Sequence, residues 1–595
     1  MNVLGISAFC HDASAALIAD GRLFAGAEER YTRIKHDRGF PALAIADCLR
    51  RAGLTSEELD AVVLHEVPDD ALAARAGDTR TGPTATRAED GTLARLRLRD
   101  ELSRRLHIPP SRVAFCPHHL SHACQAFIGA PFDEAAVLVV DSAGAGTSTA
   151  LFHGRKGETL EMRLLQDIPH PHSLGLLYSA FTAFLGFQPD DGESSVMALA
   201  SFGRPRHLEQ VGRILRLQTD GSYEIDPRYL DPCGDVPYTS AFLALFGRPR
   251  GARDPLPFDT LATGPVAVGP DHQRYADIAA SIQRALEEAL LHLAQRLHRL
   301  TGLTNLCLAG SVALNCVANS VLLQRSPFSR LYVPPDPGDG GAALGAAAFG
   351  AFRDHPVPPL ELHPYLGSSH DEEEEIAMLS AIDLEQWEAY RPPGAPSLRD
   401  LRLDIQRHRH VDDLVATVVA DLRAGRVVGW YQGNYEIGPR ALGNRSLLAD
   451  PSRVDVARRL SRSIKSRAGF RPYAFSVAAE HAHRCMELPA ALPAPSKWMQ
   501  MVANVRDEAR DAVRAAMHVD GTNRAQVCAA ADNARYHRLL AAFGAASGLG
   551  ALLNTSFNES GFPIVRTPAE AVRMFARTDL DTLVLNDSIV RKVAG

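Results

Sequence analysis

The sequence lacks closely paired cysteines. Its nine cysteines are scattered over 595 residues, and no two of them form a CxxC pair. This argues against a small disulfide framework and against zinc sites built from paired thiols. We therefore expect a cytoplasmic protein in which the reduced thiols pack as small apolar side chains.

Long hydrophobic runs and a strong charge of one sign are also missing. No uncharged apolar run reaches about 18 residues, so we expect no membrane span. The opening MNVLGISAFCHD has no basic segment followed by an apolar core, so we expect no signal peptide. A formal net charge of −7 argues against wholesale binding of nucleic acid. With 46% hydrophobic and 22% charged residues, the composition indicates a globular protein of two to four domains.

Two histidines are the first candidates for metal binding. His118 and His122 lie four residues apart after Pro117, a good helix start, so both imidazoles would share one helix face. With 23 histidines in the chain, this spacing arises about once by chance, and the pair alone indicates little. The apolar run 136–140 then predicts a strand that ends at Asp141. Imidazole and carboxylate ligands together suit Fe, Mn or Zn.

Small-residue segments are candidates for nucleotide contact. A glycine turn begins at Gly144, directly after that strand. Gly310 separates a short strand from a helix expected from Val312, with Asn315 one turn into it. Asp339 begins a helix of very small residues, which can pack tightly against a neighbour and aims a carboxylate at the positive helix end. Asp339 could equally be a plain N-cap.

Two stretches of the chain resemble one another. VLGISAFCHDASAALIADGR begins at Val3, and VLVVDSAGAGTSTALFHGR begins at Val137. Both read as strand, turn of small residues, strand and Gly-Arg turn. This pattern predicts a weak internal duplication, the layout of actin, Hsp70 and sugar-kinase ATPases.

Segments without clear periodicity divide the chain. Residues 69–91 are expected to form a mobile loop or lid. Residues 215–260 look irregular, aromatic and Pro-rich, and we interpret them as an insertion that could shape a substrate pocket. Residues 355–372 are Pro-rich and then acidic, which predicts a linker between a domain at 1–354 and a domain at 373–595.

The C-terminal part places its cations beside glycine, proline or small polar residues, in turns and not on helix faces. The candidates are Arg440, Lys465, Arg471 and Arg524. An arginine fork fits phosphate and carboxylate groups, so together these side chains would bind a small polyanion. Ordinary surface charge is the alternative, but few acidic residues intervene.

These motifs resemble the NodU/CmcH-type O-carbamoyltransferases, which decorate natural products with carbamates. The resemblance covers nearly the whole chain. It rests, in order, on HDASAAL, EERYTRIKH, PHHLSHA, VLVVDSAGAG, VMALASFG, CLAGSVALNCVANS, GDGGAALGAA, GPRALGNRSLLADP, IKSRAGFRPYAFSVAAE, HVDGT and LLNTSFN.

The resemblance implies an α/β protein with a duplicated N-terminal actin/Hsp70-like ATPase domain and a C-terminal YrdC-like α/β domain. It implies that the C-terminal domain makes carbamoyl-adenylate from carbamoyl phosphate and ATP. The N-terminal domain would then transfer the carbamoyl group to a hydroxyl of a small-molecule natural product, as in antibiotic biosynthesis. The implied cofactors are Fe(II), or another divalent metal, and Mg with ATP.

The same resemblance assigns roles to residues. The metal ligands would be His118, His122, Asp141 and Asp339. Carbamoyl phosphate and the adenylate would be bound by Arg440, Lys465, Arg471, Arg524 and Ser556. The residues near the acceptor hydroxyl would be His11, whose imidazole could act as the base, and Lys35.

The sequence departs from the family motifs at Ser195, which replaces a lysine before VMALA, at Ser311 in GSVALN, and at Phe562 in NTSFNESGFPIV. The first change removes a positive charge expected near the nucleotide. The side chain of Ser311 narrows the space in which the backbone can approach a ligand. A tRNA threonylcarbamoyl transferase-like enzyme and a non-catalytic ATP-binding switch remain alternatives. Net charge and the fused C-terminal domain argue against the first. No motif identifies the acceptor alcohol or the oligomeric state.

Overall fold

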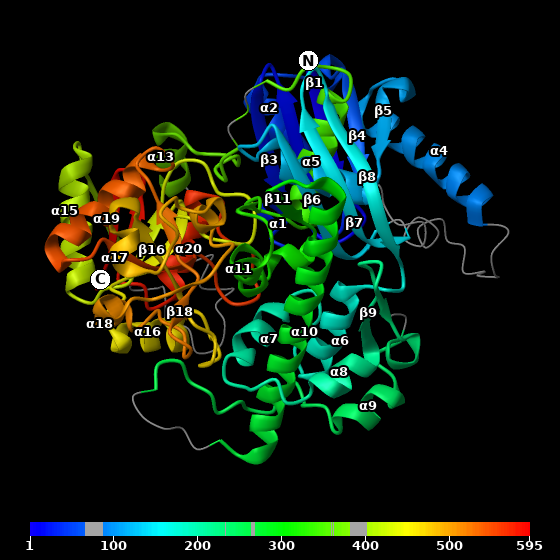
Figure 1. Ribbon diagram of the computed structural model, residues 1–595. Helices are drawn as coiled ribbons and strands as arrows, with labels where there is room; N and C mark the ends of the chain where they lie inside the picture. Colours follow the sequence, from blue (N-terminus) through cyan, green and yellow to red (C-terminus); the bar gives the residue numbers. More distant parts are fainter. Residues whose placement is uncertain are drawn as a thin grey trace. The chain divides into compact units, whose positions relative to one another are not determined.

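Short apolar runs between turns build the sheets of this chain, and longer amphipathic runs build its helices, which gives the expected mixed α/β protein (Figure 1). The computed structural model describes residues 1–65, 87–144, 146–231, 234–262, 268–358, 360, 362–380 and 401–594. The chain divides into two units. The first comprises Met1–Thr32, His36–Asp254 and Tyr275–Leu362, and the second Arg33–Lys35, Pro255–Arg274 and His363–Gly595.

The first unit contains two five-stranded sheets with the same topology. The strands of one sheet are β1 (Asn2–Ser7), β2 (Ser14–Ala19), β3 (Arg22–Ala27), β4 (Ala61–His65) and β5 (Val113–Cys116). Those of the other are β6 (Glu134–Gly144), β7 (Thr147–Lys156), β8 (Leu160–Pro169), β11 (Asn305–Ala309) and β12 (Arg330–Tyr332).

Each sheet pairs three antiparallel strands and then adds two parallel ones. The orders are β3-β2-β1-β4-β5 and β8-β7-β6-β11-β12, so β6 corresponds to β1 and β11 to β4. The two similar stretches found in the sequence form β1–β2 and β6–β7. The predicted internal duplication is therefore confirmed at the level of topology.

Two helices lie between these sheets. They are α5 (His118–Ile128), which packs on β6 and β11, and α12 (Asp339–Phe352), which packs on β1, β2 and β4. A Cβ on Gly345 would lie 1.8 Å from the backbone oxygen of Ser121 on α5, and a Cβ on Gly5 would lie 1.9 Å from that of Ala343. The small residues of α12 thus permit the close packing expected from the sequence.

Other helices cover the outer faces of the first unit. Apolar residues of α2 (Ala42–Ala52) and α4 (Arg87–Leu106) pack on the first sheet, and α6 (Leu174–Phe184) packs on β6. The long helix α10 (Pro270–Thr301) buries one side of every turn in its central part. Of the predicted loop 69–91, residues 69–86 lie outside the described part. Residues from Arg87 onward are helical, so that end of the prediction was wrong.

The segment 215–260 is more regular than expected. It forms a hairpin of β9 (Leu215–Leu217) and β10 (Tyr223–Ile225) and then α9 (Ser240–Phe246). Phe242 and Phe246 of α9 are buried against Phe181, with ring centroids 4.9 and 5.0 Å away. Phe242 and Phe246 are therefore core residues, and the prediction of an irregular segment was wrong where these short elements form.

The second unit is built on one eight-stranded sheet of order β13-β22-β21-β14-β15-β20-β16-β19. Its strands are β13 (Leu401–Arg407), β14 (Val428–Tyr431), β15 (Arg445–Ala449), β16 (Ala474–Ala478), β19 (Gln526–Cys528), β20 (Ala551–Ser556), β21 (Thr582–Leu585) and β22 (Ser588–Ala594). Helices α15 (Val411–Arg423) and α19 (Ala534–Ser547) share one core with it. Helices α16 (Val454–Arg459) and α20 (Pro568–Arg577) belong to the other core. That residues 355–372 act as a linker between domains 1–354 and 373–595 stays a prediction.

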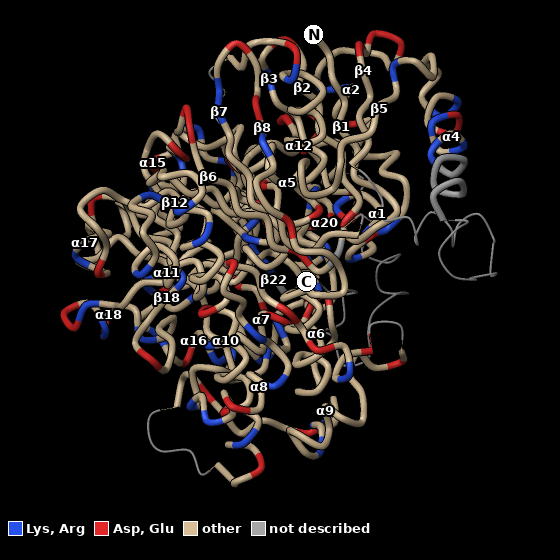
Figure 2. The backbone as a smooth tube through the Cα atoms, turned by 45° about the vertical axis from the view of Figure 1, so that its right-hand side comes forward, with Lys and Arg blue, Asp and Glu red and all other residues tan. Residues whose placement is uncertain are grey.

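Charged residues of both signs are interspersed along the described chain, as Figure 2 shows. On α4, for example, Arg105 and Glu101 form an ion pair one turn apart, at 2.7 Å. Among the described residues, no helix combines the length and the apolar character needed to cross a bilayer.

The α5–α12 contact predicts opposite effects for one substitution at two glycines. Gly345→Ala should lower the free energy of unfolding by about 1–3 kcal/mol, because the new methyl group overlaps the Ser121 carbonyl. Gly212→Ala on α8 (Leu208–Ile214) should raise it by roughly 0.5–1 kcal/mol, because nothing lies within 4 Å of the added Cβ. Thermal unfolding followed by circular dichroism measures both. Equal midpoints for the two variants would contradict the packing argument.

Candidate functional site

The first unit gathers the four predicted metal ligands in its interior. His122 Nε2 lies 3.1 Å from Asp141 Oδ2 and 3.2 Å from Asp339 Oδ1. His118 Nε2 lies 3.5 and 3.7 Å from the same two oxygens. Both imidazoles and Asp141 are buried. These four side chains come from α5, β6 and the first turn of α12, so elements distant in sequence build one cluster.

Local backbone geometry makes room for this cluster. A Cβ on Gly144 would come within 2.1 Å of the His118 ring, so the absence of a side chain there admits the imidazole. The prediction that the strand ends at Asp141 was wrong. After a register shift between Val140 and Gly144, β6 continues and pairs Gly144 with Thr147. This irregularity bends β6 next to the carboxylate of Asp141.

A third imidazole, His65, joins the cluster and was not predicted. It is the last residue of β4 and is fully buried. Its ring centroid lies 4.2 Å from that of His118. The ligand atoms of His65, His118, His122 and Asp339 all lie within 4.8 Å of one another. The available signal was its place at the carboxyl end of an apolar strand parallel to β1.

The donor atoms of the cluster fit a divalent cation. Nε2 of His65 and Nε2 of His118 are buried and form no hydrogen bond within the described part of the chain. Buried polar atoms normally have a partner. Metal–ligand bonds of about 2.0–2.2 Å place neighbouring ligand atoms roughly 3 Å apart, close to the separations found here. The residues present can therefore hold a metal ion.

The protonation states of the cluster follow from burial and from the carboxylates. Burial and the neighbouring imidazoles lower the pKa of His65 well below its ordinary value, so this ring is neutral. Burial works against protonation of His122 too, but hydrogen bonds to Asp141 and Asp339 raise its pKa to about 10. The buried Asp141 and the partly buried Asp339 thus favour a positive partner, which a proton or a metal ion can supply.

Ser311, one of the departures from the family motifs, contacts this cluster. Its hydroxyl donates a hydrogen bond to Asp141 Oδ1, which also accepts from the backbone N–H of Ser142 at 2.7 Å. The extra side chain therefore fixes the orientation of the Asp141 carboxylate. Of the other departures, Ser195 is buried on α7 (Glu193–Ala200), and Phe562 is exposed.

The predicted nucleotide-contact segment at Gly310 folds differently from expectation. Gly310 has φ of +89°, and a Cβ there would lie 2.2 Å from the Val140 oxygen, so glycine is needed for packing on β6. A 3₁₀ turn, η4 (Ser311–Leu314), precedes α11 (Cys316–Arg325). The placement of Asn315 one turn into a helix was wrong, because the 3₁₀ turn makes Asn315 the N-cap of α11. Its side chain accepts from Ala318 N at 3.0 Å.

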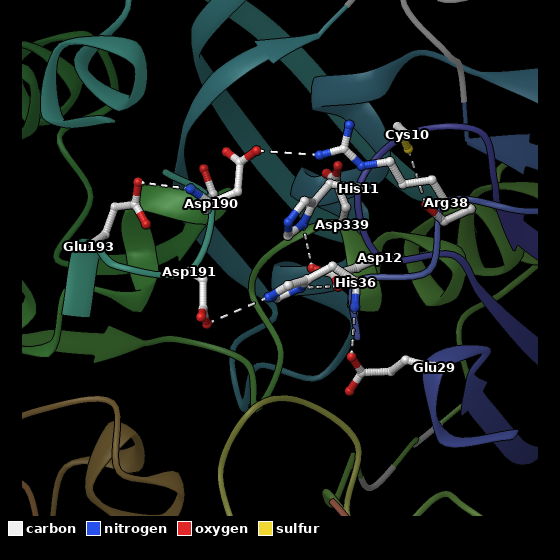
Figure 3. Close-up of polar contacts among 12 residues, drawn as sticks. Cys10, His11, Asp12, Glu29, His36, Arg38, Asp190, Asp191, Glu193 and Asp339 are labelled. Carbon is white, nitrogen blue, oxygen red and sulfur yellow. Dashed lines mark hydrogen bonds and ion pairs between the residues drawn. The ribbon is translucent and has the colours of Figure 1, made fainter. Parts of the chain in front are cut away.

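A second imidazole–carboxylate group surrounds His11, in the turn after β1 (Figure 3). His11 Nδ1 lies 2.6 Å from Asp12 Oδ2, and His36 Nδ1 lies 2.8 Å from Asp12 Oδ1. His36 Nε2 lies 3.7 Å from Asp191. The side chains of His11, Asp12 and His36 are close enough to one another to hold a metal. However, the Nδ1 atom of each ring has its own oxygen of Asp12 at hydrogen-bond distance, so a carboxylate that accepts from two imidazoles describes the group better.

Asp12 decides the electrostatics of this group. Burial lowers the pKa of His11, but the hydrogen bond and the charge of Asp12 outweigh burial, so the pKa lies above its ordinary value. His36 opposes protonation of His11, and Asp190 favours it. With Nδ1–H donated to Asp12, His11 keeps its lone pair on Nε2, an atom that forms no hydrogen bond within the described residues. His11 is thus arranged to accept a proton at Nε2.

In the second unit, the predicted cation Lys465 is engaged by its neighbours. Its Nζ donates to the backbone oxygens of Ser556 and Asn558 at 2.9 and 2.8 Å and to Asn558 Oδ1 at 2.6 Å. Ser556 Oγ, at 3.2 Å from Nζ, donates to the same Oδ1. Lys465 therefore ties together the end of β20 and the following loop.

Several cations lie within electrostatic reach of one another around Lys465. Burial, then Arg467, Arg471 and Lys35, lower the pKa of Lys465 well below its ordinary value. Burial and then Arg471 lower the pKa of Arg467 to about 9, with Arg524 adding to the effect. We call these five residues the cation cluster: Lys35, Lys465, Arg467, Arg471 and Arg524. Arg467 was missed from the predicted ligands, and Lys35 belongs to this unit and not to that of His11.

Arg440 lies half-buried in the loop between β14 and β15. Two buried charged residues hold the shape of that loop: Glu436 within it and Arg445 at the start of β15. Glu436 Oε1 accepts from the backbone N–H of Leu442 at 2.7 Å and of Arg445 at 3.2 Å. The Arg445 guanidinium donates to the Gln432 oxygen at 2.7 Å. The sequence reading of GPRALGNR singled out Arg440 but missed Glu436 and Arg445, whose hydrogen bonds fix the loop.

Comparison with known proteins agrees with these features. Residues 2–89 and 93–348 match the family model described as the carbamoyltransferase N-terminus, and residues 419–592 match the carbamoyltransferase C-terminus. An uncharacterised protein of Synechocystis sp. is 36% identical over 100% of this chain and 97% of its own length. Nodulation protein NolNO of Sinorhizobium fredii is 34% identical, over 98% of this chain and 79% of its own length.

A relative with a printed activity is the 3'-hydroxymethylcephem-O-carbamoyltransferase of Streptomyces clavuligerus. It is 34% identical over 53% of this chain and 54% of its own length. Because the two family models together match most of the chain, and relatives align over nearly all of it, this protein belongs to the carbamoyltransferase family of transferase enzymes.

Proposed function

We propose that this enzyme is an ATP-dependent O-carbamoyltransferase that acts on a hydroxyl of a small-molecule natural product. It forms carbamoyl-adenylate from carbamoyl phosphate and ATP in the second unit, a YrdC-like domain. The first unit, with an actin/Hsp70-like ATPase fold, transfers the carbamoyl group to the alcohol. The eight described cysteines form no disulfide, which supports a cytoplasmic location.

The observation that carries this proposal is the cation cluster. Like charges held at short range in a buried place raise the free energy of the protein unless an anion joins them. Carbamoyl phosphate and the polyphosphate of ATP are such anions, and arginine forks match their oxygens. The cations Lys465, Arg471 and Arg524, with Arg440, would also stabilise charge on the departing phosphate and pyrophosphate. Ser556 would add a hydroxyl at the end of β20.

In the first unit, His118, His122, Asp141 and Asp339 would hold Fe(II) or another divalent metal. When bound, such an ion supplies positive charge for a nucleotide phosphate. The backbone near Gly144 and Gly310, together with Asn315, stays the predicted nucleotide contact. Mg would accompany ATP.

Transfer needs a base for the acceptor hydroxyl, and we assign that role to His11. Its Nε2 takes the proton while the alcohol oxygen forms a bond to the carbamoyl carbon and the bond to the AMP oxygen breaks. Asp12 positions the imidazole and favours the imidazolium that results. Because an acyl-adenylate reacts with water, the step has to be shielded from solvent. Lys35 stays a second candidate for this step.

The products of the reaction test this proposal. The purified protein, given carbamoyl phosphate, ATP and a panel of aminoglycoside, macrolide, ansamycin, cephem and guanidinium-alkaloid alcohols, should release AMP and pyrophosphate. Mass spectrometry should show one carbamoyl unit added to the true acceptor. Release of ADP would indicate a kinase. Nucleotide binding without consumption of carbamoyl phosphate would indicate an ATP-binding switch, and tight tRNA binding would revive the tRNA-modifying alternative.

Single substitutions should separate the two half-reactions. Arg440→Ala should lower carbamoyl-adenylate formation at least about 100-fold, because a donor to a charged oxygen is lost. His11→Ala should leave adenylate formation unchanged and slow the transfer step by about 100-fold or more. Pyrophosphate release and carbamoylated product, measured separately, provide the two readouts. Equal loss of both steps in both variants would contradict this division of labour.

The contact between Asp12 and His11 predicts a shift in the pH profile of transfer. Neutral His11 is the reactive form, so transfer slows as the pH falls through its raised pKa. Asp12→Asn removes the carboxylate that raises this pKa, so the acidic limb should move to lower pH while the plateau rate drops. Asp191→Asn is the matched control and should shift the limb less, because the Asp191 carboxylate contacts His36 whereas Asp12 is the carboxylate bonded to His11. An unmoved limb in Asp12→Asn would refute the role of Asp12.

A further inference from the structure

We propose that His65 is a ligand of the divalent metal in the first unit, so that three imidazoles and two carboxylates hold the ion. This inference rests on the metal site of the proposed function and extends its ligand set. The four ligands assigned from motifs do not include His65. It enters the cluster through the position of β4 in the sheet.

Distance is the first argument for His65. Its ring centroid lies 4.2 Å from that of His118 and 5.4 Å from that of His122. Its ligand nitrogen, those of His118 and His122, and an oxygen of Asp339 are mutually within 4.8 Å. Ligand atoms on opposite sides of one ion lie about twice a metal–ligand bond apart, roughly 4.0–4.4 Å. The separations found here are at most slightly longer than this span, so small side-chain shifts would let all four atoms bind one ion with the backbone unchanged.

The second argument is the hydrogen bonding of the ring. Ser7 ends β1, and the parallel pairing of β1 with β4 brings its hydroxyl to 3.2 Å from His65 Nδ1. If Nδ1–H donates to Ser7, the lone pair is on Nε2. Nε2 is buried and has no hydrogen bond in the described structure. Metal-bound imidazoles commonly donate their other N–H to an outer acceptor in this way.

Comparison with His119 separates a ligand from an ordinary buried histidine. His119 is also buried. Its ring lies 5.2 Å from that of His118, yet it has no atom in the group of mutually close ligands. His119 therefore lies beside the site, whereas His65 has its ligand atom among the others.

A third imidazole changes which ion the site prefers. A metal-bound imidazole adds a nitrogen donor without adding charge, and two carboxylates already balance a divalent ion. A set of three nitrogens and two oxygens suits Fe(II), Co(II) or Zn(II), whereas Mg prefers oxygen ligands. His65→Gln, which replaces a nitrogen donor by an amide, should lower the affinity for Co(II) about tenfold or more and leave the weak affinity for Mg unchanged.

Proton NMR of the full-length protein loaded with Co(II) counts the imidazoles directly. Each ring bound through Nε2 carries an exchangeable Nδ1–H that the paramagnetic ion shifts far from the normal range. The wild type should show three such signals. His65→Gln and His65→Phe should show two, and the matched control His119→Phe should keep three.

The possible outcomes separate this inference from the proposed function. Two shifted signals in wild-type protein with bound Co(II) would refute the role of His65 and leave the four-ligand site intact. Failure of the wild type to bind Co(II), Fe(II) or Zn(II) would overturn the metal site itself. The wild-type count decides the question even if His65→Phe does not fold.

Discussion

The constraint on which the first unit depends is the gathering of two carboxylates and three buried imidazoles among apolar side chains. Asp141 is buried and Asp339 is largely so, and removing such a charge from water costs several kcal/mol unless cationic partners replace the water. Only the small residues of α12 allow that helix to approach α5 and bring Asp339 next to His118 and His122. The close packing of α5 and α12 thus brings the charged side chains together at a cost in free energy, and a bound metal would offset that cost.

The second unit shows the opposite imbalance. Its cation cluster gathers positive charge in a partly buried place, where burial and the neighbouring cations lower the pKa of Lys465 and of Arg467. Negative charge gathers in one unit and positive charge in the other, an arrangement typical of ligand sites. Under the proposed function, a divalent ion would balance the first and the oxygens of phosphorylated substrates would balance the second.

The sequence predicted those parts of the structure that depend on local spacing. Periodicity and turn residues predicted the strands at 61–65 and 428–431 and the helix that carries His118 and His122. The two similar stretches of sequence predicted the two sheets of the same topology. His65 was missed because its partners Ser7 and His118 meet it only through strand pairing. Glu436 was missed for a related reason, since its carboxylate binds backbone amides that no residue pattern reveals. The 3₁₀ turn before Asn315 likewise depends on packing of Gly310 against β6 and not on propensity.

The hydrogen bonds around Asp141 limit what the metal site can accept. Ser311 and the Ser142 amide both donate to Oδ1, which leaves Oδ2 as the oxygen facing His118 and His122. If His65 is a ligand as proposed, this oxygen, one from Asp339 and three imidazole nitrogens would give the site mostly nitrogen donors, which favours Fe(II), Co(II) or Zn(II) over Mg. Under the proposed function the ion would supply positive charge beside a nucleotide phosphate, and His11 would accept the proton of the alcohol.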